Sequence, residues 1–138
     1  ILHEVDSPKF FMNHLKSLLK GGEYIYINVP NANSLHRRIA LEAGIIKKQN
    51  EVSSRGLFFK TMRVFSVDDL KDLAISSGFT VVDFGTLGLK PFTHEQMDKI
   101  INDSYCDSEL LTEALFNSDN IVPGMGSEIW MLLKANKN

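Results

Sequence analysis

The feature that most constrains the fold is an almost unbroken run of apolar, β-branched and aromatic residues at positions 23–29, EYIYINV. Gly21 and Gly22 precede this run and Pro30 ends it. Such a run is typical of a strand that is covered on both faces. It therefore predicts a sheet with helices packed around it.

Helix-like and strand-like segments alternate along the rest of the chain, which indicates the α/β class. Ser7 followed by Pro8 predicts a helix start, because serine caps free amides and proline suits the first helical position. Ser66 and Thr93 each begin a segment with the spacing of a capping box. We expect helices at 8–20, 67–77, after Thr93 and at 107–117, a loop and short helix at 31–44, a connection or lid at 47–60, and further strands at 79–84 and 128–134.

The composition is that of a soluble globular protein, with 43% hydrophobic and 23% charged residues. No segment has the pattern of a signal peptide or a membrane span. Cys106 is the single cysteine, which excludes an internal disulfide and favours a reducing, cytoplasmic location. A net charge of −2 gives no general attraction to nucleic acid. We therefore expect a small-molecule substrate, and neither nucleic acid nor a membrane as partner.

The chain opens with Ile1 and Leu2, without a methionine or a polar lead-in. Domain boundaries usually fall in polar, flexible linkers. We interpret residues 1–138 as a single portion of a domain from a longer protein, and a natural boundary remains the alternative.

Several segments, in this order, resemble one protein family. ILHEVDSP at 1–8 is similar to the segment after the fourth strand of class I methyltransferases that use S-adenosylmethionine. LLKGGEYIYINVPN resembles their fifth-strand signature, although the customary proline before the two glycines is absent. MRVFSVDDLKDLAISSGFTVVD resembles their next helix and strand. LGLKPFTHEQM and SEIWMLLK are similar to the closing part of a subset acting on small metabolites.

The resemblance implies the C-terminal half of a class I, Rossmann-like methyltransferase. The fold would be α/β, a partial Rossmann-like sheet whose N-terminal half is missing. That half carries the glycine-rich turn and the acidic residue that bind most of the cofactor. The parent would transfer a methyl group from S-adenosylmethionine to oxygen or nitrogen of a small metabolite, with sugars among the candidates. We expect the chain alone to bind the cofactor weakly or not at all and to be inactive.

The resemblance also implies roles for the first residues. Ile1, Leu2 and His3 would flank the cofactor. His3 and Glu4 would point toward the methyl group or the nucleophile, where a catalytic base takes a proton. The family more often has glutamate before histidine, and many such enzymes work largely by proximity. The alternative for His3 is an imidazole packed at the helix entry.

A polar cluster follows the 23–29 run, beside the crevice where open α/β sheets bind ligands. Its arginines have the donor geometry to hold a carboxylate or phosphate. The alternative is an asparagine cap followed by a solvated helix face. Arg63 and Lys90, farther along the chain, likewise either bind substrate or lie in solvent. The predicted substrate-binding residues are Asn31, Asn33, His36, Arg37, Arg38, Arg63 and Lys90. The four histidines are too scattered to predict a metal site.

Two other classes of function stay open. The chain would be a non-catalytic α/β binding or interaction module if the resemblance reflects only a common scaffold. It would belong to a dinucleotide-dependent oxidoreductase if the upstream sequence carries G-x-G-x-x-G. In each partial-sheet interpretation the missing strands leave an exposed sheet edge, so we expect the chain to self-associate through that edge.

Overall fold

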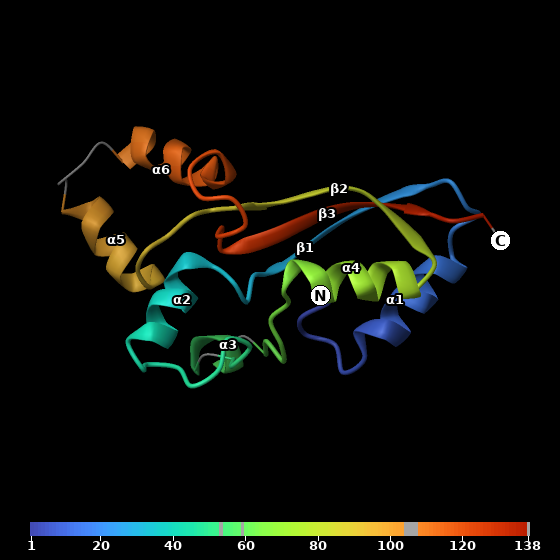
Figure 1. Cartoon of the computed structure of the whole chain (residues 1–138), viewed down its shortest axis with the longest axis horizontal. Coiled ribbons are helices and arrows are strands. Elements are labelled where there is room, and N and C mark those ends of the chain that lie inside the picture. The colour runs from blue at the N-terminus through green and yellow to red at the C-terminus, as the bar shows by residue number, and fades with distance from the viewer. Residues whose placement is uncertain (53, 59, 104–107, 138) are drawn as a thin grey trace.

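The computed structural model describes residues 1–52, 54–58, 60–103 and 108–137, which form helices around a small sheet. Cys106 and Asp107, which entered the expectations above, lie outside the described residues. The elements, in chain order (Figure 1), are α1 (Pro8–Ser17), β1 (Tyr24–Pro30), α2 (Leu35–Glu42), α3 (Ser54–Phe58), α4 (Val67–Ser76), β2 (Phe79–Leu87), α5 (His94–Asn102), α6 (Ser108–Phe116), the 3₁₀ helix η1 (Ser118–Asn120) and β3 (Glu128–Ala135).

The three strands lie in the order β1-β3-β2 within the described part of the chain. β3 is antiparallel to both neighbours, so β1 and β2 run parallel to each other with β3 between them. Met131 of β3 is opposite Ile27 on one side and Phe84 on the other. A bulge interrupts β2 between Val81 and Asp83. The expected α/β class is thereby confirmed.

One face of the sheet packs against α1 and α4, which lie side by side beneath it (Figure 1). Alternate residues of β3 point into this core, as the twofold repeat of a strand requires. The core is closed by the first residues of the chain as well as by the helices. Its buried members are Leu2, Met12, Val29, Phe65, Leu70, Ala74, Phe79, Ile129, Met131, Leu133 and Ala135.

The opposite face of the sheet is largely open over β1. Tyr24 and Tyr26 are both more than half exposed. The ring of Tyr26 stacks on Trp130 of β3, with 6.2 Å between the ring centroids and 13° between the planes. α6 lies on this side of the sheet but toward the other end (Figure 1). The expectation of cover on both faces of the 23–29 strand is therefore not met by the described residues.

Local capping sets the helix starts. The hydroxyl of Ser7 accepts a hydrogen bond from the backbone amide of Phe10, and complete capping boxes begin α4 at Ser66 and α5 at Thr93. These helix starts are confirmed. α1 ends at Ser17, earlier than expected, because the chain turns toward β1 through Gly21 and Gly22, both with φ near +95°.

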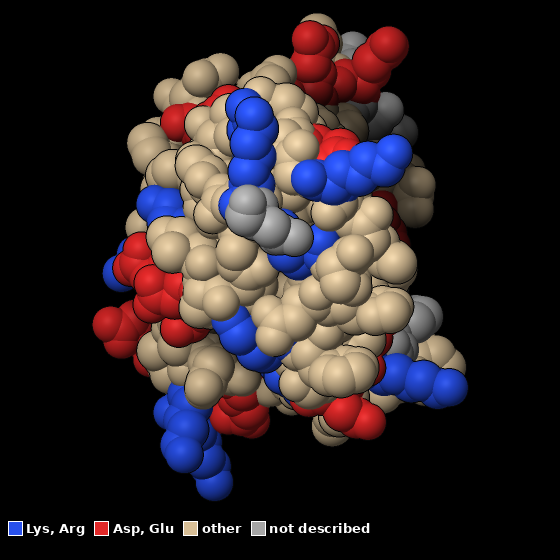
Figure 2. All heavy atoms as spheres, turned by 90° about the vertical axis from the view of Figure 1, so that its right-hand side faces the viewer, with Lys and Arg blue, Asp and Glu red and all other residues tan. Residues whose placement is uncertain are grey.

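The surface at the C-terminal end of β3 carries both signs of charge. Basic and acidic side chains are dispersed there among wide uncharged areas (Figure 2). None of the described helices combines the length and the apolar character needed to cross a bilayer.

Candidate functional site

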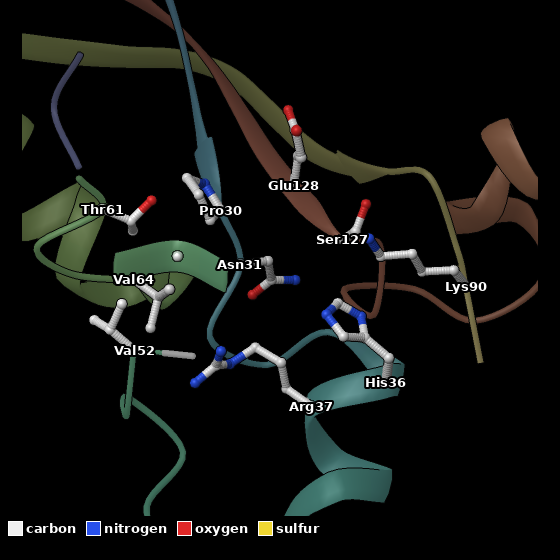
Figure 3. Close-up of a pocket in the computed structure, with 11 residues that line it drawn as sticks. Pro30, Asn31, His36, Arg37, Val52, Thr61, Val64, Lys90, Ser127 and Glu128 are labelled. Atoms are coloured by element: carbon white, nitrogen blue, oxygen red, sulfur yellow. The ribbon is translucent and has the colours of Figure 1, made fainter. Parts of the chain in front are cut away.

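A cavity of about 340 Å³ lies where the parallel strands β1 and β2 end. Pro30 and Asn31 close one side of it, and Lys90 follows β2 on another (Figure 3). Open α/β sheets bind their ligands beyond the carboxyl ends of parallel strands. The cavity therefore occupies the place that the sequence predicted for substrate. Its other lining residues are His36, Arg37, Val52, Gly56, Thr61, Val64, Ser127 and Glu128.

Asn31 is almost completely buried, and its side-chain amide forms hydrogen bonds with three backbone groups. Its amide nitrogen donates to the carbonyl oxygens of Gly124, at 3.0 Å, and Gly126, at 2.7 Å. Its carbonyl oxygen accepts from the backbone amide of Asn33 at 2.8 Å. Asn31 thus fixes the loop before β3 against the end of β1, and it lines the cavity as part of the frame.

Arg37 is buried as well, so it does not lie on the solvated helix face that was the alternative for this residue. Nε and Nη2 donate to the carbonyl oxygen of Gln49 at 3.2 and 2.7 Å, and Nη2 also donates to that of Glu51. Burial lowers the pKa of the guanidinium, and the nearby carboxylate of Glu51 opposes that shift. The guanidinium therefore holds segment 49–51 against α2, so the apolar residue Ile39 faces outward instead.

His36, on the first turn of α2, brings a neutral imidazole to the cavity (Figure 3). Burial lowers its pKa to about 4, and the positive charges of Lys90 and Arg37 add to the shift. Its Nδ1 is buried and has no hydrogen-bond partner. A neutral imidazole carries one donor and one acceptor nitrogen. His36 therefore lines the cavity with an uncharged ring at neutral pH.

The N-terminal residues border this region without lining the cavity. The carbonyl oxygen of His3 accepts from the backbone amide of Met62 at 2.7 Å, next to the cavity residue Thr61. His3 Nε2 lies 3.4 Å from Glu4 Oε1, and His3 Nδ1 is buried without a partner. Burial, and next the positive charge of the chain's amino group, lower the pKa of His3. Leu2 is buried in the core, while Ile1 is largely exposed.

The remaining predicted residues lie away from the cavity. Asn33 and Arg38 are exposed. Arg63 Nη2 donates to the carbonyl oxygen of Asp6 at 2.8 Å and so ties the N-terminal segment to the segment before α4. The structure thus brings four of the seven predicted substrate residues together, namely Asn31, His36, Arg37 and Lys90.

Three polar cavity residues were missed by sequence reasoning. Thr61, Ser127 and Glu128 contribute hydroxyl and carboxylate oxygens to the lining. Thr61 lies in a connecting segment and Ser127 and Glu128 lie at the start of β3, far apart in sequence. No local pattern identifies them. The central position of β3 brings Ser127 and Glu128 to the end of β1, and Thr61 reaches the cavity from the segment after α3. Within the described residues, no group of three or more metal-ligating side chains has the arrangement to hold a metal ion.

Comparison with known proteins gives one kind of match. No protein-family model matches the chain, and no curated protein matches it. Among solved structures, a SAM-dependent methyltransferase from Thermotoga maritima, described as a possible histamine N-methyltransferase, superposes with a TM-score of 0.54 at 20% identity. The match covers 99% of this chain and 52% of the other.

The two chains share a fold. At this level of identity the likeness extends to the arrangement of helices and strands. The chain spans about half the length of the methyltransferase that it matches.

Proposed function

We propose that the chain is the C-terminal half of a class I, Rossmann-like methyltransferase, and that its parent methylates oxygen or nitrogen of a small metabolite. The observation that carries this proposal is the position of the cavity. It lies beyond the ends of two parallel strands, in a chain that superposes over nearly its whole length on half of a SAM-dependent methyltransferase.

The sheet supports an origin in a larger Rossmann-like domain. β1 is an edge strand within the described residues, and its outer side bonds only at the end, where Pro30 and Ala32 pair with Phe65. The adjoining face exposes Tyr24 and Tyr26. Unpaired edges and exposed aromatic faces are features that complete domains cover. Further parallel strands and a covering helix would satisfy both.

The residues present fit part of a cofactor site. S-adenosylmethionine, when bound, would supply the methyl group. His3 and His36 each hold a buried Nδ1 without a partner, and His3 is the one that the family resemblance assigns to the cofactor. The side chain of Leu2 belongs to the core and leaves only its backbone for such a role. Most of the cofactor site would come from the upstream half.

The cavity side chains suit the positioning of an acceptor. Thr61 and Ser127 offer hydroxyl groups, and Glu128 offers a carboxylate that accepts hydrogen bonds. His3, with its pKa lowered by burial, is neutral at pH 7 and accepts a proton from a hydroxyl or amine. Glu4, 3.4 Å from the imidazole, stabilises the positive charge that this proton brings. Holding acceptor and methyl group in line would provide most of the rate.

Calorimetric titration with S-adenosylmethionine tests the proposal on two proteins, this chain and the parent extended upstream through its first strand. We expect micromolar binding by the parent and none by the chain alone. In the parent, His3→Gln should weaken binding or lower the methylation rate, whereas His14→Gln, on the exposed side of α1, should change neither. Absence of binding by the parent would contradict the proposal and favour the non-catalytic module.

A further inference from the structure

A second cavity, of about 560 Å³, adjoins the first. Its size is within the range of small-molecule sites. The two cavities share His36, Arg37 and Lys90, which form the wall between them. The other residues come from α2 and the segment after it and from the start of α5, and they are Ile39, Ala40, Ile45, Ile46, Pro91, Phe92, Thr93, His94, Glu95 and Gln96.

The second cavity exposes apolar surface to water from both of its walls. Ile39 is 43% exposed and Ile45 76% on one wall, and Phe92 is 47% exposed on the other. Removing apolar surface from water is favourable, by about 25 cal/mol per Å². A ligand with an apolar body would therefore gain free energy by filling the space between these side chains.

The wall shared by the two cavities consists of polar residues, but the hydrogen-bonding groups of Arg37 are already engaged. The Arg37 guanidinium is engaged by the carbonyl oxygens of segment 49–51. His36 is neutral and keeps its buried Nδ1 unpaired. Lys90 and Arg37 place positive charge close enough to depress the basicity of this imidazole. The same charges disfavour an ammonium group beside His36, while an uncharged hydroxyl meets no such repulsion.

We infer that the two cavities form one substrate site for a small apolar alcohol or phenol. Its apolar body lies between Ile39 and Phe92, and its hydroxyl reaches His36 and faces the first cavity. A sugar fits less well between Ile39 and Phe92, because these side chains offer no hydrogen-bond partner to its hydroxyls. Two of the polar residues in the lining, Thr93 and Gln96, bond to each other in the capping box of α5. This substrate class rests on the proposed methyltransferase function, although the binding itself does not require the cofactor.

The test is a titration of the 138-residue chain with 2-naphthol, followed by calorimetry and by NMR chemical-shift changes. Methyl glucoside serves as the polar probe. We expect 2-naphthol to bind and to shift signals of α2 and of segment 90–96, and methyl glucoside to bind at least about tenfold more weakly. Equal or tighter binding of methyl glucoside, or shifts elsewhere in the chain, overturns the inference.

Variants at the cavity wall separate this inference from the proposed function. Phe92→Ser should weaken 2-naphthol binding at least about tenfold. Ile75→Ser removes a side chain that is 61% exposed on α4, outside the cavity, and should leave binding unchanged. If 2-naphthol does not bind, or both variants bind like the original chain, the substrate class is wrong. Binding of S-adenosylmethionine by the parent then still decides the proposed function by itself.

Discussion

Asn31 and Arg37 direct their hydrogen-bonding groups at backbone carbonyl oxygens around the candidate site. Asn31 joins the end of β1 to the loop before β3, and Arg37 joins α2 to segment 49–51. Buried donors of this kind are expensive to leave unpaired. The cavity therefore has a frame whose dimensions these two side chains set.

Replacement of Asn31 tests this role. Asn31→Ala leaves the buried carbonyl oxygen of Gly126 and the partly buried one of Gly124 without their donor, so we expect the free energy of unfolding in urea to fall by about 2 kcal/mol. Asn33→Ala is the matched control, because Asn33 is exposed and its backbone amide, which bonds to Asn31, is retained. A change of less than about 0.5 kcal/mol at both positions would contradict the framing role of Asn31.

His36 makes stability depend on pH. Its pKa is about 4 in the folded chain and 6.5 in the unfolded chain, so between these values the unfolded state binds more protons. The contribution is complete above pH 6.5 and is lost as the pH falls toward 4. We expect a loss of about 2 kcal/mol, reduced from the full linkage value because the imidazole keeps some contact with solvent.

Urea denaturation at a series of pH values measures this effect. His36→Gln should flatten the profile between pH 6.5 and 4. His3, whose pKa is also lowered, adds a change of the same sign, so the His3→Gln variant and the double variant apportion the two contributions. A profile that is unchanged in His36→Gln would show that burial does not hold this imidazole neutral.

Four residues that the sequence singled out line the cavity, but the sequence did not indicate what each of them bonds to. The polarity of Asn31 and Arg37 indicates hydrogen bonding, yet it does not tell ligand from backbone. Which of the two a side chain meets depends on loops that close against it from elsewhere in the chain. For the same reason the position of Glu128, the first residue of the strand predicted at 128–134, did not indicate that its side chain lines the cavity.

Among the elements, helix starts were the most predictable part of the fold. Ser7, Ser66 and Thr93 cap with groups three residues away, so the information is entirely local. The orientation of α2 was not predictable from its own periodicity. Arg37 faces inward because its guanidinium donates to carbonyl oxygens of segment 49–51. That segment is a connection whose sequence shows only weak hydrophobic periodicity.

The two capping boxes should differ in their effect on stability. α4 buries Leu70 and Ala74 in the core, whereas α5 buries no residue of its span. We expect Ser66→Ala to lower the global free energy of unfolding by about 1 kcal/mol. Thr93→Ala should instead loosen α5 locally. Urea denaturation reports the first effect and amide hydrogen exchange along α5 the second. Equal global losses would contradict this assignment.

At the scale of the whole molecule, the open edge of β1 and the exposed aromatic face beside it remain to be covered. We predict that the isolated chain self-associates through this surface. Light scattering at rising concentration should show a mass above that of the monomer. Tyr26→Lys, which places a charge on the open face, should reduce association, and Ile75→Lys on the far helix α4 should not.

A monomer at high concentration would contradict the predicted association. The proposed parent protein, whose upstream half would cover Tyr24 and Tyr26, should remain monomeric under the same conditions. The opposite result would be a parent protein that associates as strongly as this chain does and whose Tyr26→Lys variant is a monomer. That result would indicate that the surface forms contacts between copies of the protein.

The central position of β3 also governs the order in which the chain can fold. β3 follows both other strands in the chain, yet within the described residues β1 and β2 each pair with β3 and not with each other. Until residues 128–135 leave the ribosome, the strand that joins β1 to β2 is missing, and so are the side chains that β3 contributes to the core. The sheet described here therefore forms only after these residues have emerged. Loss of residues 128–135 would separate β1 from β2 rather than shorten the sheet, so damage to this strand has global consequences.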